Sequence, residues 1–503
     1  MTSNGVKGCL VLQRRFAYLG HELAILLKEK HGISEFCGFV HERDGYDFLT
    51  KQTDLAYSGL ILDEDIQKRY RGEKLDMEYL RDFEREYGNL WEFITVDRVI
   101  RQGQLVREYP YDTPPYTYEE MLRIVQVYAK ALLAFVDAQK PDFLFVYQPG
   151  ALGTLMLCAI AKKKGVPTIF VVPSIAENRT VVSERYDRLT WIEERFRESL
   201  KKNAHAVEGY EEARTFIETF RKKPVMYSTV YSSLIKHGKW KQFDFLSPRN
   251  LKRTYSYIRL AITQWTRNPE KQSDYTTVHP YNYFIDRIRR KLRNVVGAED
   301  LYDTYDRTKP FVFYPLHFEP ELSILLLSPF DTDQLHIVKR LARSLPVGMY
   351  VYVKEHPQMM PYRPRRFYEE LKKIPNVRLL RPYLSSFDII RDCALVAIIT
   401  GAAGWEASLF GKPVITFGEV FYNALPSVAS SRTPEELPAL VAAQLSLRPR
   451  DEDIIRFVAA LLEDSAECDL LHLWEIETDP KKKREGLLPF ADLVAQKVRQ
   501  LCR

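Results

Sequence analysis

From residue 309 onward, short apolar runs alternate with amphipathic segments. The apolar runs are rich in β-branched and aromatic residues, which favour buried strands, while the segments between them carry apolar residues at helical spacing. Strands are predicted over 310–316, 348–356, 377–382, 395–400 and 413–418. Helices are predicted over 332–345, 363–374, 385–393 and 404–411. This alternation predicts a doubly wound parallel sheet.

A similar but less regular pattern begins near the N-terminus. Strands are predicted over 6–13, 34–40, 142–148 and 167–174, and helices over 21–32 and 154–165. The last two strands, with the Gly-bearing loop and helix between them, form a βαβ crossover. Residues 50–135 are charged and aromatic with helical spacing. The predicted fold class is therefore α/β, with two Rossmann-like halves facing a cleft.

The remaining segments divide the chain further. Residues 185–305 are basic and mostly helical in pattern, which is typical of an insertion or interdomain element, and the end of the chain is helical. We therefore expect an N-terminal Rossmann-like domain and a C-terminal one, a helical insertion between them, and terminal helices. The predicted boundaries are 1–184, 185–305, 306–445 and 446–503.

Composition indicates a globular protein without a membrane-spanning segment. Of the 503 residues 46% are hydrophobic and 28% charged, and every long apolar run is interrupted by Pro or Gly. We expect a cytoplasmic protein, with a peripheral position on the inner membrane as an extension of that expectation. The six cysteines form no CxxC pair and lie mostly in apolar segments. Buried free thiols, and no metal site, are the expectation.

The positive charge is unevenly distributed. Residues 236–293 contain fourteen Lys and Arg against four Asp and Glu, with aromatic residues among them. An anionic membrane surface is the partner we favour, because Lys and Arg are attracted to it and Trp and Tyr tolerate the interface. Nucleic acid fits the charge but not the chemistry described below, so no nucleic-acid partner is predicted. A solvated basic helix pair is the remaining alternative.

The strand predicted at 348–356 ends on a chemically distinctive sequence, Lys354-Glu355-His356-Pro357. Pro357 cannot donate to a sheet ladder and disfavours helical geometry in the residue before it, so the strand must stop near His356. Ligands of open parallel sheets bind at the carboxyl ends of the strands. An imidazole there can donate to a phosphate oxygen, and a protonated one neutralises leaving-group charge. Glu355 would orient the imidazole or bind a sugar hydroxyl.

Two further loops should lie at the same sheet edge. The first contains Pro382 and Tyr383, and the second runs from Thr400 through Gly401 to Gly404 before a helix that holds Glu406. Glycines in such a loop allow backbone N–H groups to approach a phosphate at the helix N-terminus. Glu406 would bind a ribose diol, or would only favour the helix dipole. Helix capping alone explains the serines at 385 and 386.

The C-terminal half also resembles a known family. The runs YPLHFEPE, VKEHP, IPNVRLL, ITGAAGWEASLFGKPVITFG and FYNALPSV, within about residues 310–430, resemble the capsule polysaccharide biosynthesis family, which includes Kdo transferases. The resemblance implies a GT-B fold, with the donor nucleotide held by the C-terminal domain and the acceptor by the N-terminal one. It also implies that His356 contacts the donor phosphate. Thr400 and Gly401 fall where similar enzymes place a small hydroxyl residue on that phosphate.

These expectations combine into one predicted function. The protein would be a glycosyltransferase that builds a bacterial surface polysaccharide or a lipid-linked glycan from a nucleotide sugar, with CMP-Kdo or a related ulosonic acid favoured. A UDP- or GDP-sugar donor, a nucleotide-sugar epimerase of the same fold, and a non-catalytic assembly or export factor are the alternatives. No DxD-type metal motif stands where we expect one, so the donor is the substrate and no cofactor is predicted. Lys354, His356 and backbone amides would then act at the leaving group.

The catalytic carboxylate is harder to locate from the sequence. Glu177 follows the strand at 167–174, and Glu319 follows the strand at 310–316, so both are predicted to face the cleft. We expect one of them to be an acid/base or acceptor-binding group. A surface carboxylate without a catalytic role is the alternative for each.

Overall fold

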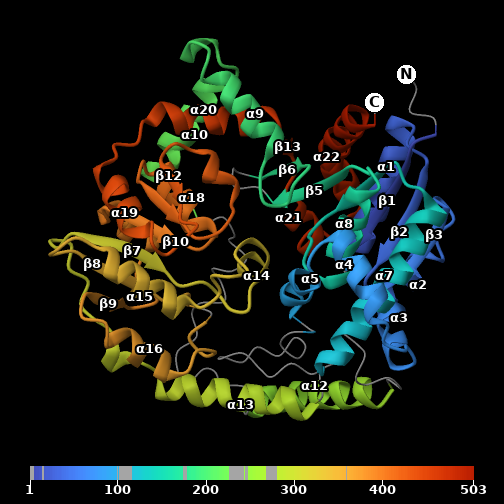
Figure 1. The fold of residues 1–503 in the computed structure, drawn as a ribbon, viewed down its shortest axis with the longest axis horizontal. Coiled ribbons are helices and arrows are strands. Elements are labelled where there is room, and N and C mark those ends of the chain that lie inside the picture. Colours follow the sequence, from blue (N-terminus) through green and yellow to red (C-terminus); the bar gives the residue numbers. More distant parts are fainter. Residues whose placement is uncertain are drawn as a thin grey trace. The chain divides into compact units, whose positions relative to one another are not determined.

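The computed structural model describes residues 5–13, 16–98, 100, 116–173, 178–225, 243, 247–267, 280–357 and 359–502. The chain forms two compact units. The first combines the described residues of 1–100, 116–210 and 456–502, and the second those of 211–455. Each unit contains one sheet with helices packed around it (Figure 1). The α/β fold class with two Rossmann-like halves is therefore confirmed.

The sheet of the first unit has seven strands in the order β13-β6-β5-β4-β1-β2-β3. The five strands from β5 to β3 in this order pair in parallel, and β6 and β13 pair antiparallel. The strands are β1 (Lys7–Leu12), β2 (Glu35–Val40), β3 (Tyr57–Leu62), β4 (Phe143–Val146), β5 (Thr168–Pro173), β6 (Arg179–Ser183) and β13 (Ala466–Glu467).

Helices cover this sheet and extend the first unit. They are α1 (Phe16–His31), α2 (Arg43–Leu49), α3 (Asp63–Lys68), α4 (Met77–Tyr87), α5 (Leu90–Val96), α7 (Tyr118–Gln139), α8 (Leu152–Lys163), α9 (Thr190–Ser199), α20 (Asp451–Glu463), α21 (Leu470–Glu475) and α22 (Pro480–Leu501). Helix α20 begins in the second unit and continues into the first. The start of α7 illustrates the local code, because Thr117 and Glu120 form a reciprocal capping box.

The second unit has a six-stranded sheet in the order β12-β11-β10-β7-β8-β9, and every pair in it is parallel. Its strands are β7 (Phe311–Pro315), β8 (Tyr350–Lys354), β9 (Val377–Leu380), β10 (Leu395–Ile398), β11 (Val414–Thr416) and β12 (Val428–Ser430). Its helices are α10 (Tyr210–Lys222), α12 (Pro248–Arg267), α13 (Pro280–Val296), α14 (Leu322–Leu327), α15 (Gln334–Ser344), α16 (Arg365–Lys372), α17 (Ser386–Asp392), α18 (Ala402–Leu409) and α19 (Leu437–Ser446). All five strands predicted after residue 309 are present.

The structure departs from the prediction in the N-terminal half. Strand β3 lies within 50–135, the segment predicted to be helical, because its run YSGLIL pairs with the edge of β2. The antiparallel strand β6 was also not predicted. It follows β5 within a few residues and returns beside it. Short, partly polar strands of this kind carry no helical or strand period long enough to recognise.

The chain is also grouped differently from the predicted boundaries. Residues 456–502 belong to the first unit, in which Leu487, Phe490 and Val494 of α22 join the core that contains Leu23 and Leu27 of α1. The apolar face of α22 is therefore buried under the first sheet and does not form a separate tail. Residues 185–210 also pack in the first unit, whereas 211–305 belong to the second.

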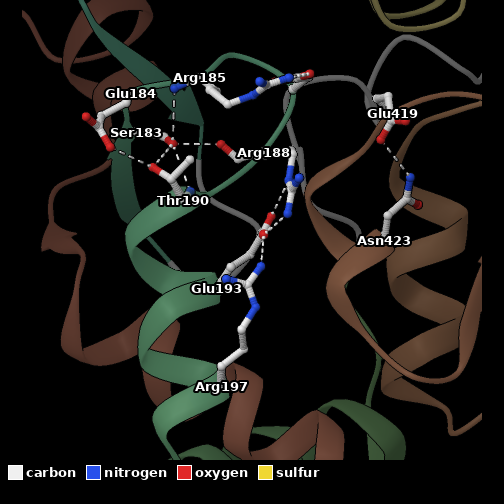
Figure 2. A network of polar contacts seen from close by, with 10 residues as sticks. Ser183, Glu184, Arg185, Arg188, Thr190, Glu193, Arg197, Glu419 and Asn423 are labelled. Atoms are coloured by element: carbon white, nitrogen blue, oxygen red, sulfur yellow. Dashed lines mark hydrogen bonds and ion pairs between the residues drawn. The ribbon is translucent and has the colours of Figure 1, made fainter. Parts of the chain in front are cut away.

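A polar network holds the connection between β6 and α9 in the first unit (Figure 2). Ser183 donates its hydroxyl to the Arg188 carbonyl at 2.6 Å, and the buried Glu193 carboxylate accepts from Arg188 and, at 3.1 Å, from Arg197. A buried carboxylate needs such partners, because burial of an unpaired charge is costly. This turn is thus fixed by its own side chains.

All six cysteines are free thiols, and four of them are buried. Among the helices of the described ranges, none has the length and apolar character needed to cross a bilayer.

Candidate functional site

Three strand ends meet at the carboxyl edge of the second sheet. Strand β7 lies between β10 and β8, so the loops that follow these three strands are neighbours. They contain His317 after β7, Lys354 to His356 at the end of β8, and Thr400 with Gly401 after β10. The sheet order therefore brings together the His-Pro sequence and the glycine loop predicted to bind phosphate, and it adds His317. The open edge of such a sheet is where ligands bind.

Arg363 holds the loop that follows β8. Its guanidinium is 1% exposed, and its Nε lies 2.6 Å from Oε2 of Glu355, which is fully buried. The other carboxylate oxygen of Glu355 accepts from the His356 backbone N–H at 2.7 Å, and Tyr368 donates its hydroxyl to Oε2 at 3.0 Å. Burial raises the pKa of Glu355, and the Arg363 charge opposes the shift. Glu355 thus holds the backbone of His356, whereas its two predicted roles, orienting the imidazole or binding a sugar hydroxyl, stay predictions.

Glu319 is the second carboxylate on Arg363. It is 2% exposed, accepts from Arg363 Nη1 at 3.0 Å, and receives a short hydrogen bond from the side chain of Gln334. Burial raises its pKa as well. In this arrangement the Glu319 carboxylate is buried and does not lie on the surface. The structure therefore disfavours the predicted acid/base role, for the physical reason that both of its oxygens are already occupied inside the fold.

Two ionisable groups at this edge have pKa values that burial shifts toward neutral pH. Lys354 is 7% exposed, and burial lowers the pKa of its ammonium to about 8. Burial also raises the pKa of Glu406 on α18 to about 7, with the nearby Lys354 charge opposing that shift. Each charge is disfavoured by its surroundings and partly supported by the other. Strong perturbation of this kind is typical of functional sites as well as of ion-pair networks.

His356 lies half-buried against the ring of Phe318, with the ring centroids 5.9 Å apart. Burial lowers the pKa of the imidazole to about 4, and Glu321 is the main charge that opposes this shift. The free protein therefore carries a neutral His356 at neutral pH. A neutral ring still donates a hydrogen bond to phosphate, so the imidazole can act as a donor, while Lys354 supplies the charge.

Thr400 and Gly401 form the turn before α18. Gly401 has φ of 98°, a conformation that favours glycine, and it caps the helix. Thr400 is fully buried, and its hydroxyl has no hydrogen-bond partner within the described parts of the chain. Buried hydroxyl groups are normally satisfied, so this unsatisfied hydroxyl beside the N-terminus of α18 is unusual.

Gly404 has a packing role that the sequence did not predict, and its predicted role near a phosphate stays a prediction. A Cβ at this position would lie 2.4 Å from the hydroxyl of Tyr422, which itself donates to the Gly401 carbonyl at 2.8 Å. The glycine is therefore needed for packing inside the unit.

In the neighbouring loop, Pro382 is buried and Tyr383 is 61% exposed. Ser385 caps α17 as predicted, because its side chain accepts from the Asp388 backbone N–H.

The first unit has a polar edge that the sequence analysis missed. Thr154 Oγ1, at the start of α8, lies 2.9 Å from His41 Nε2 and within 3.5 Å of Gln13 Nε2. Asp63, which follows β3, is 1% exposed, and burial raises its pKa well above the usual range. Gln13 and His41 end predicted strands, which was the available signal. Glu177, the other predicted catalytic carboxylate, lies outside the described residues.

Helices α12 and α13 contain the described part of the basic 236–293 segment. They expose apolar and aromatic side chains, with Tyr255 66%, Leu260 53% and Ile288 57% exposed, beside exposed Lys and Arg residues. Helix α13 is joined to the loop after β8, because Arg290 donates to the Tyr362 hydroxyl at 2.8 Å and Arg293 donates to the Tyr362 carbonyl at 2.6 Å.

The described side chains include no group of three or more His, Cys, Asp or Glu that could hold a metal ion.

These features define a two-unit α/β protein whose second sheet carries a polar, anion-compatible edge. Residues 235–436 match the family model described as capsule polysaccharide biosynthesis protein, and this range contains the whole second sheet. Over these residues, about two fifths of its length, the chain is similar to the capsule polysaccharide biosynthesis family.

Individual relatives are more distant. Protein FixF of Sinorhizobium fredii is 31% identical over 150 residues, which are 29% of this chain and 36% of that protein. The chain thus aligns with about a third of that relative's length. Among solved structures, the β-Kdo 2,7 transferase KpsC of Thermosulfurimonas dismutans is 15% identical, with 81% of this chain and 97% of that chain covered and a TM-score of 0.36. UDP-GlcNAc 2-epimerase of Methanocaldococcus jannaschii is 11% identical, with 91% and 100% covered and a TM-score of 0.23. TM-scores this low establish no shared arrangement of the two units.

Proposed function

We propose that the protein is a glycosyltransferase whose nucleotide-sugar donor binds at the carboxyl edge of the second sheet, with CMP-Kdo or a related ulosonic acid as the favoured donor. The observation that carries this proposal is the convergence of Lys354, His356 and the unsatisfied hydroxyl of Thr400 beside the N-terminus of α18. A cation, a neutral donor, a hydroxyl and backbone N–H groups are a set suited to a phosphate. The family match over the same residues supports a polysaccharide product.

The chemistry assigned to these residues concerns the leaving group. In the transfer, a bond forms between an acceptor hydroxyl oxygen and the anomeric carbon, and the bond from that carbon to the phosphate oxygen breaks. The electron pair of the broken bond stays on the phosphate, and the hydroxyl proton passes to a base. Lys354 and His356 would stabilise the developing phosphate charge, which is the electrostatic part of catalysis. Glu406 would bind the ribose, and the glycan or lipid-linked acceptor would bind on the first unit.

Calorimetry with CMP, UDP and GDP tests the donor site directly. We expect CMP to bind most tightly, and we expect His356→Ala to weaken it about 10- to 100-fold, because a hydrogen bond to a charged group contributes roughly 1.5–3 kcal/mol. His336→Ala is the matched control, since His336 is exposed on α15 of the same unit. Wild-type CMP affinity in His356→Ala would contradict the proposed phosphate contact. Tighter binding of UDP or GDP than of CMP would contradict the proposed CMP-linked donor.

Two assays separate transferase from the alternatives. A transferase consumes nucleotide sugar faster when a glycan acceptor is present, whereas an epimerase turns over without one. A non-catalytic assembly factor binds a nucleotide at most and releases no product. Acceptor-independent epimer formation, followed by NMR of the sugar protons, would overturn the transferase proposal.

We also propose that α12 and α13 dock the protein on the cytoplasmic face of an anionic membrane, where a lipid-linked acceptor is reached. Exposed Lys252, Arg253 and Arg289 lie on the same two helices as the exposed apolar residues. Each basic residue near an anionic surface contributes about 1 kcal/mol, and aromatic rings tolerate the interface.

Co-sedimentation with vesicles tests this docking. Binding to phosphatidylglycerol vesicles should weaken with salt, and Lys252→Glu/Arg253→Glu should reduce it by roughly 30-fold or more, which corresponds to about 2 kcal/mol. Lys481→Glu/Lys482→Glu, on exposed positions of α22, is the charge-matched control. Equal binding to neutral vesicles, or equal loss in both variants, would refute the electrostatic docking.

A further inference from the structure

His317 and Glu321 form a pair at the same edge that the phosphate chemistry does not use. Both follow β7, and the His317 ring is packed beside the turn before α18, where a Cβ on Gly401 would lie 3.1 Å from its Cε1. The His317 side chain is 6% exposed, and that of Glu321 is 44% exposed. The pair therefore joins a buried imidazole to a carboxylate that solvent or a ligand can reach.

The hydrogen bonds of His317 determine which nitrogen of its neutral ring carries the proton. The backbone N–H of Thr400 donates to Nε2 of His317 at 3.3 Å. A backbone N–H cannot reverse its role, so Nε2 must keep its lone pair and the proton of the neutral ring is on Nδ1. The His317 backbone is fixed as well, because its N–H donates to Gln334 at 2.7 Å and Arg363 donates to its carbonyl at 2.6 Å. His317 is thus an oriented Nδ1–H donor.

The Nδ1–H donor and the carboxylate of Glu321 are close but do not touch. Nδ1 lies 3.9 Å from Oε2 of Glu321, beyond hydrogen-bond distance, and Nδ1 has no other hydrogen-bond partner in the part of the chain that the structure describes. An oxygen atom could lie at hydrogen-bond distance, about 2.8 Å, from both Nδ1 and Oε2. The angle between its two hydrogen bonds would then be roughly 90°. Only a group that accepts one hydrogen bond and donates another satisfies both sides, and a hydroxyl group does this. A phosphate oxygen would be repelled by the carboxylate.

We propose that His317 and Glu321 bind one hydroxyl group of the donor's sugar, with Nδ1–H donating to the hydroxyl oxygen and Oε2 of Glu321 accepting its proton. The inference rests on the proposed function, because it places the sugar next to the phosphate at Thr400. It makes these two residues specificity-determining contacts for the sugar, distinct from the contacts to the nucleotide. Glu321 is also the main charge that favours the protonated form of His356 in the loop after β8.

The test compares a nucleotide with its sugar derivative. Calorimetry of CMP and of CMP-Kdo is carried out on the full chain for the wild type, Glu321→Ala and His317→Gln. Glu419→Ala is the matched control, since Glu419 is an exposed carboxylate of the same unit. We expect CMP affinity to stay within about twofold in Glu321→Ala, and CMP-Kdo affinity to fall about 10-fold or more, as for the loss of a hydrogen bond to a charged group. The same pattern is expected in His317→Gln, and the double variant should lose little more than either single one.

Two other results of this comparison would overturn the proposal. Equal weakening of CMP and CMP-Kdo would make Glu321 a determinant of the phosphate site, and unchanged affinity for both would exclude any ligand contact. If UDP or GDP is the nucleotide that binds the wild type, the comparison uses UDP-GlcNAc or GDP-mannose in place of CMP-Kdo. If no nucleotide binds the wild type, the proposed function fails and this inference fails with it. A nitrogen NMR spectrum of His317 that shows the proton on Nε2 would also refute it, independently of any ligand.

Discussion

The two sheets end in chemically different edges. In the second unit, the edge is built from charges, with Arg363 between the buried carboxylates of Glu355 and Glu319, and Lys354 beside them. In the first unit, the edge holds hydrogen-bond contacts of Thr154 with His41 and Gln13, a partly exposed ion pair of Arg43 with Asp65, and the buried Asp63 carboxyl, whose pKa burial raises well above its usual range. The two edges therefore differ in the burial of their ion pairs, because the Arg363 pairs of the second unit are fully buried whereas the Arg43–Asp65 pair of the first is partly exposed.

The comparison also shows where rigidity comes from. Buried ion pairs tie distant parts of the second unit together, because the removal of one partner leaves an uncompensated charge inside the fold. Hydrogen bonds between neutral groups contribute less, typically about 1 kcal/mol each. The loop that presents His356 should thus be far more sensitive to substitution beneath it than the edge of the first unit.

The largest effect is expected from Arg363→Met. It leaves Glu355 and Glu319 buried without their cation, and we expect the free energy of unfolding of the second unit to fall by about 3–5 kcal/mol. Arg365→Met is the control two residues away, because its partners Asp300 and Glu369 are exposed and the loss should stay near 1 kcal/mol or less. Denaturant unfolding followed by circular dichroism measures both. Similar losses in the two variants would show that the buried ion pairs of Arg363 stabilise the unit no more than the exposed ion pairs of Arg365.

Glycines near the start of α18 and α8 provide the next test. A Cβ at Gly404 would meet the Tyr422 hydroxyl at 2.4 Å, and one at Gly153 would meet the Phe39 ring at 2.7 Å and the Asp63 carboxylate at 2.8 Å. We expect alanine at either position to lower the free energy of unfolding by about 1–3 kcal/mol through overpacking. Gly72→Ala, whose Cβ would have no neighbour closer than 4.0 Å, should be close to neutral. Tolerance of Gly404→Ala with loss of nucleotide binding would instead restore the ligand role predicted for that glycine.

A smaller effect, of opposite sign to that of Arg363→Met, is expected from Asp63→Asn. Burial raises the folded-state pKa of Asp63 above the unfolded value of 3.8, so its contribution to stability is complete below pH 3.8 and is lost as the pH rises toward the folded-state pKa. Asparagine cannot ionise and avoids this loss. The variant should therefore equal or exceed the wild type in stability at pH 7, and the difference should grow from pH 4 upward. Thermal unfolding between pH 4 and 8 checks this, and a clear destabilisation at pH 7 would indicate an ionised, paired Asp63.

The smallest expected effect is a change in the pKa of His356, at the edge of the second sheet. Burial keeps the pKa of His356 at about 4 in the free protein, and a bound phosphate dianion should raise it by stabilising the imidazolium. Phosphate binding should consequently take up protons below about pH 6. Histidine proton NMR with and without inorganic phosphate measures the shift directly, with exposed His336 as the internal reference. An unchanged His356 titration in saturating phosphate would place the anion elsewhere.

The sequence determined most of the strands and helices of the second sheet. Apolar runs of strand length, separated by amphipathic segments, were sufficient to predict β7 to β11, since both patterns are local. Pro357 marked the end of β8 and thereby placed Lys354, Glu355 and His356 at the edge. The same reasoning was less successful before residue 185, where β3 and β6 are short and pair only through their neighbours.

Only the tertiary structure decided how these residues are paired. Arg363 meets Glu319 across 44 residues of sequence, and the Thr400 amide meets His317 across 83. Such contacts depend on β7 lying between β8 and β10, an order that no local period encodes. For this reason the sequence could identify Glu319 as a carboxylate after a strand but could not show that its oxygens are occupied. It could equally not show that Gly404 packs against Tyr422, or that α22 completes the core of the first unit. Local patterns specify elements, whereas burial and pairing arise only when distant segments meet.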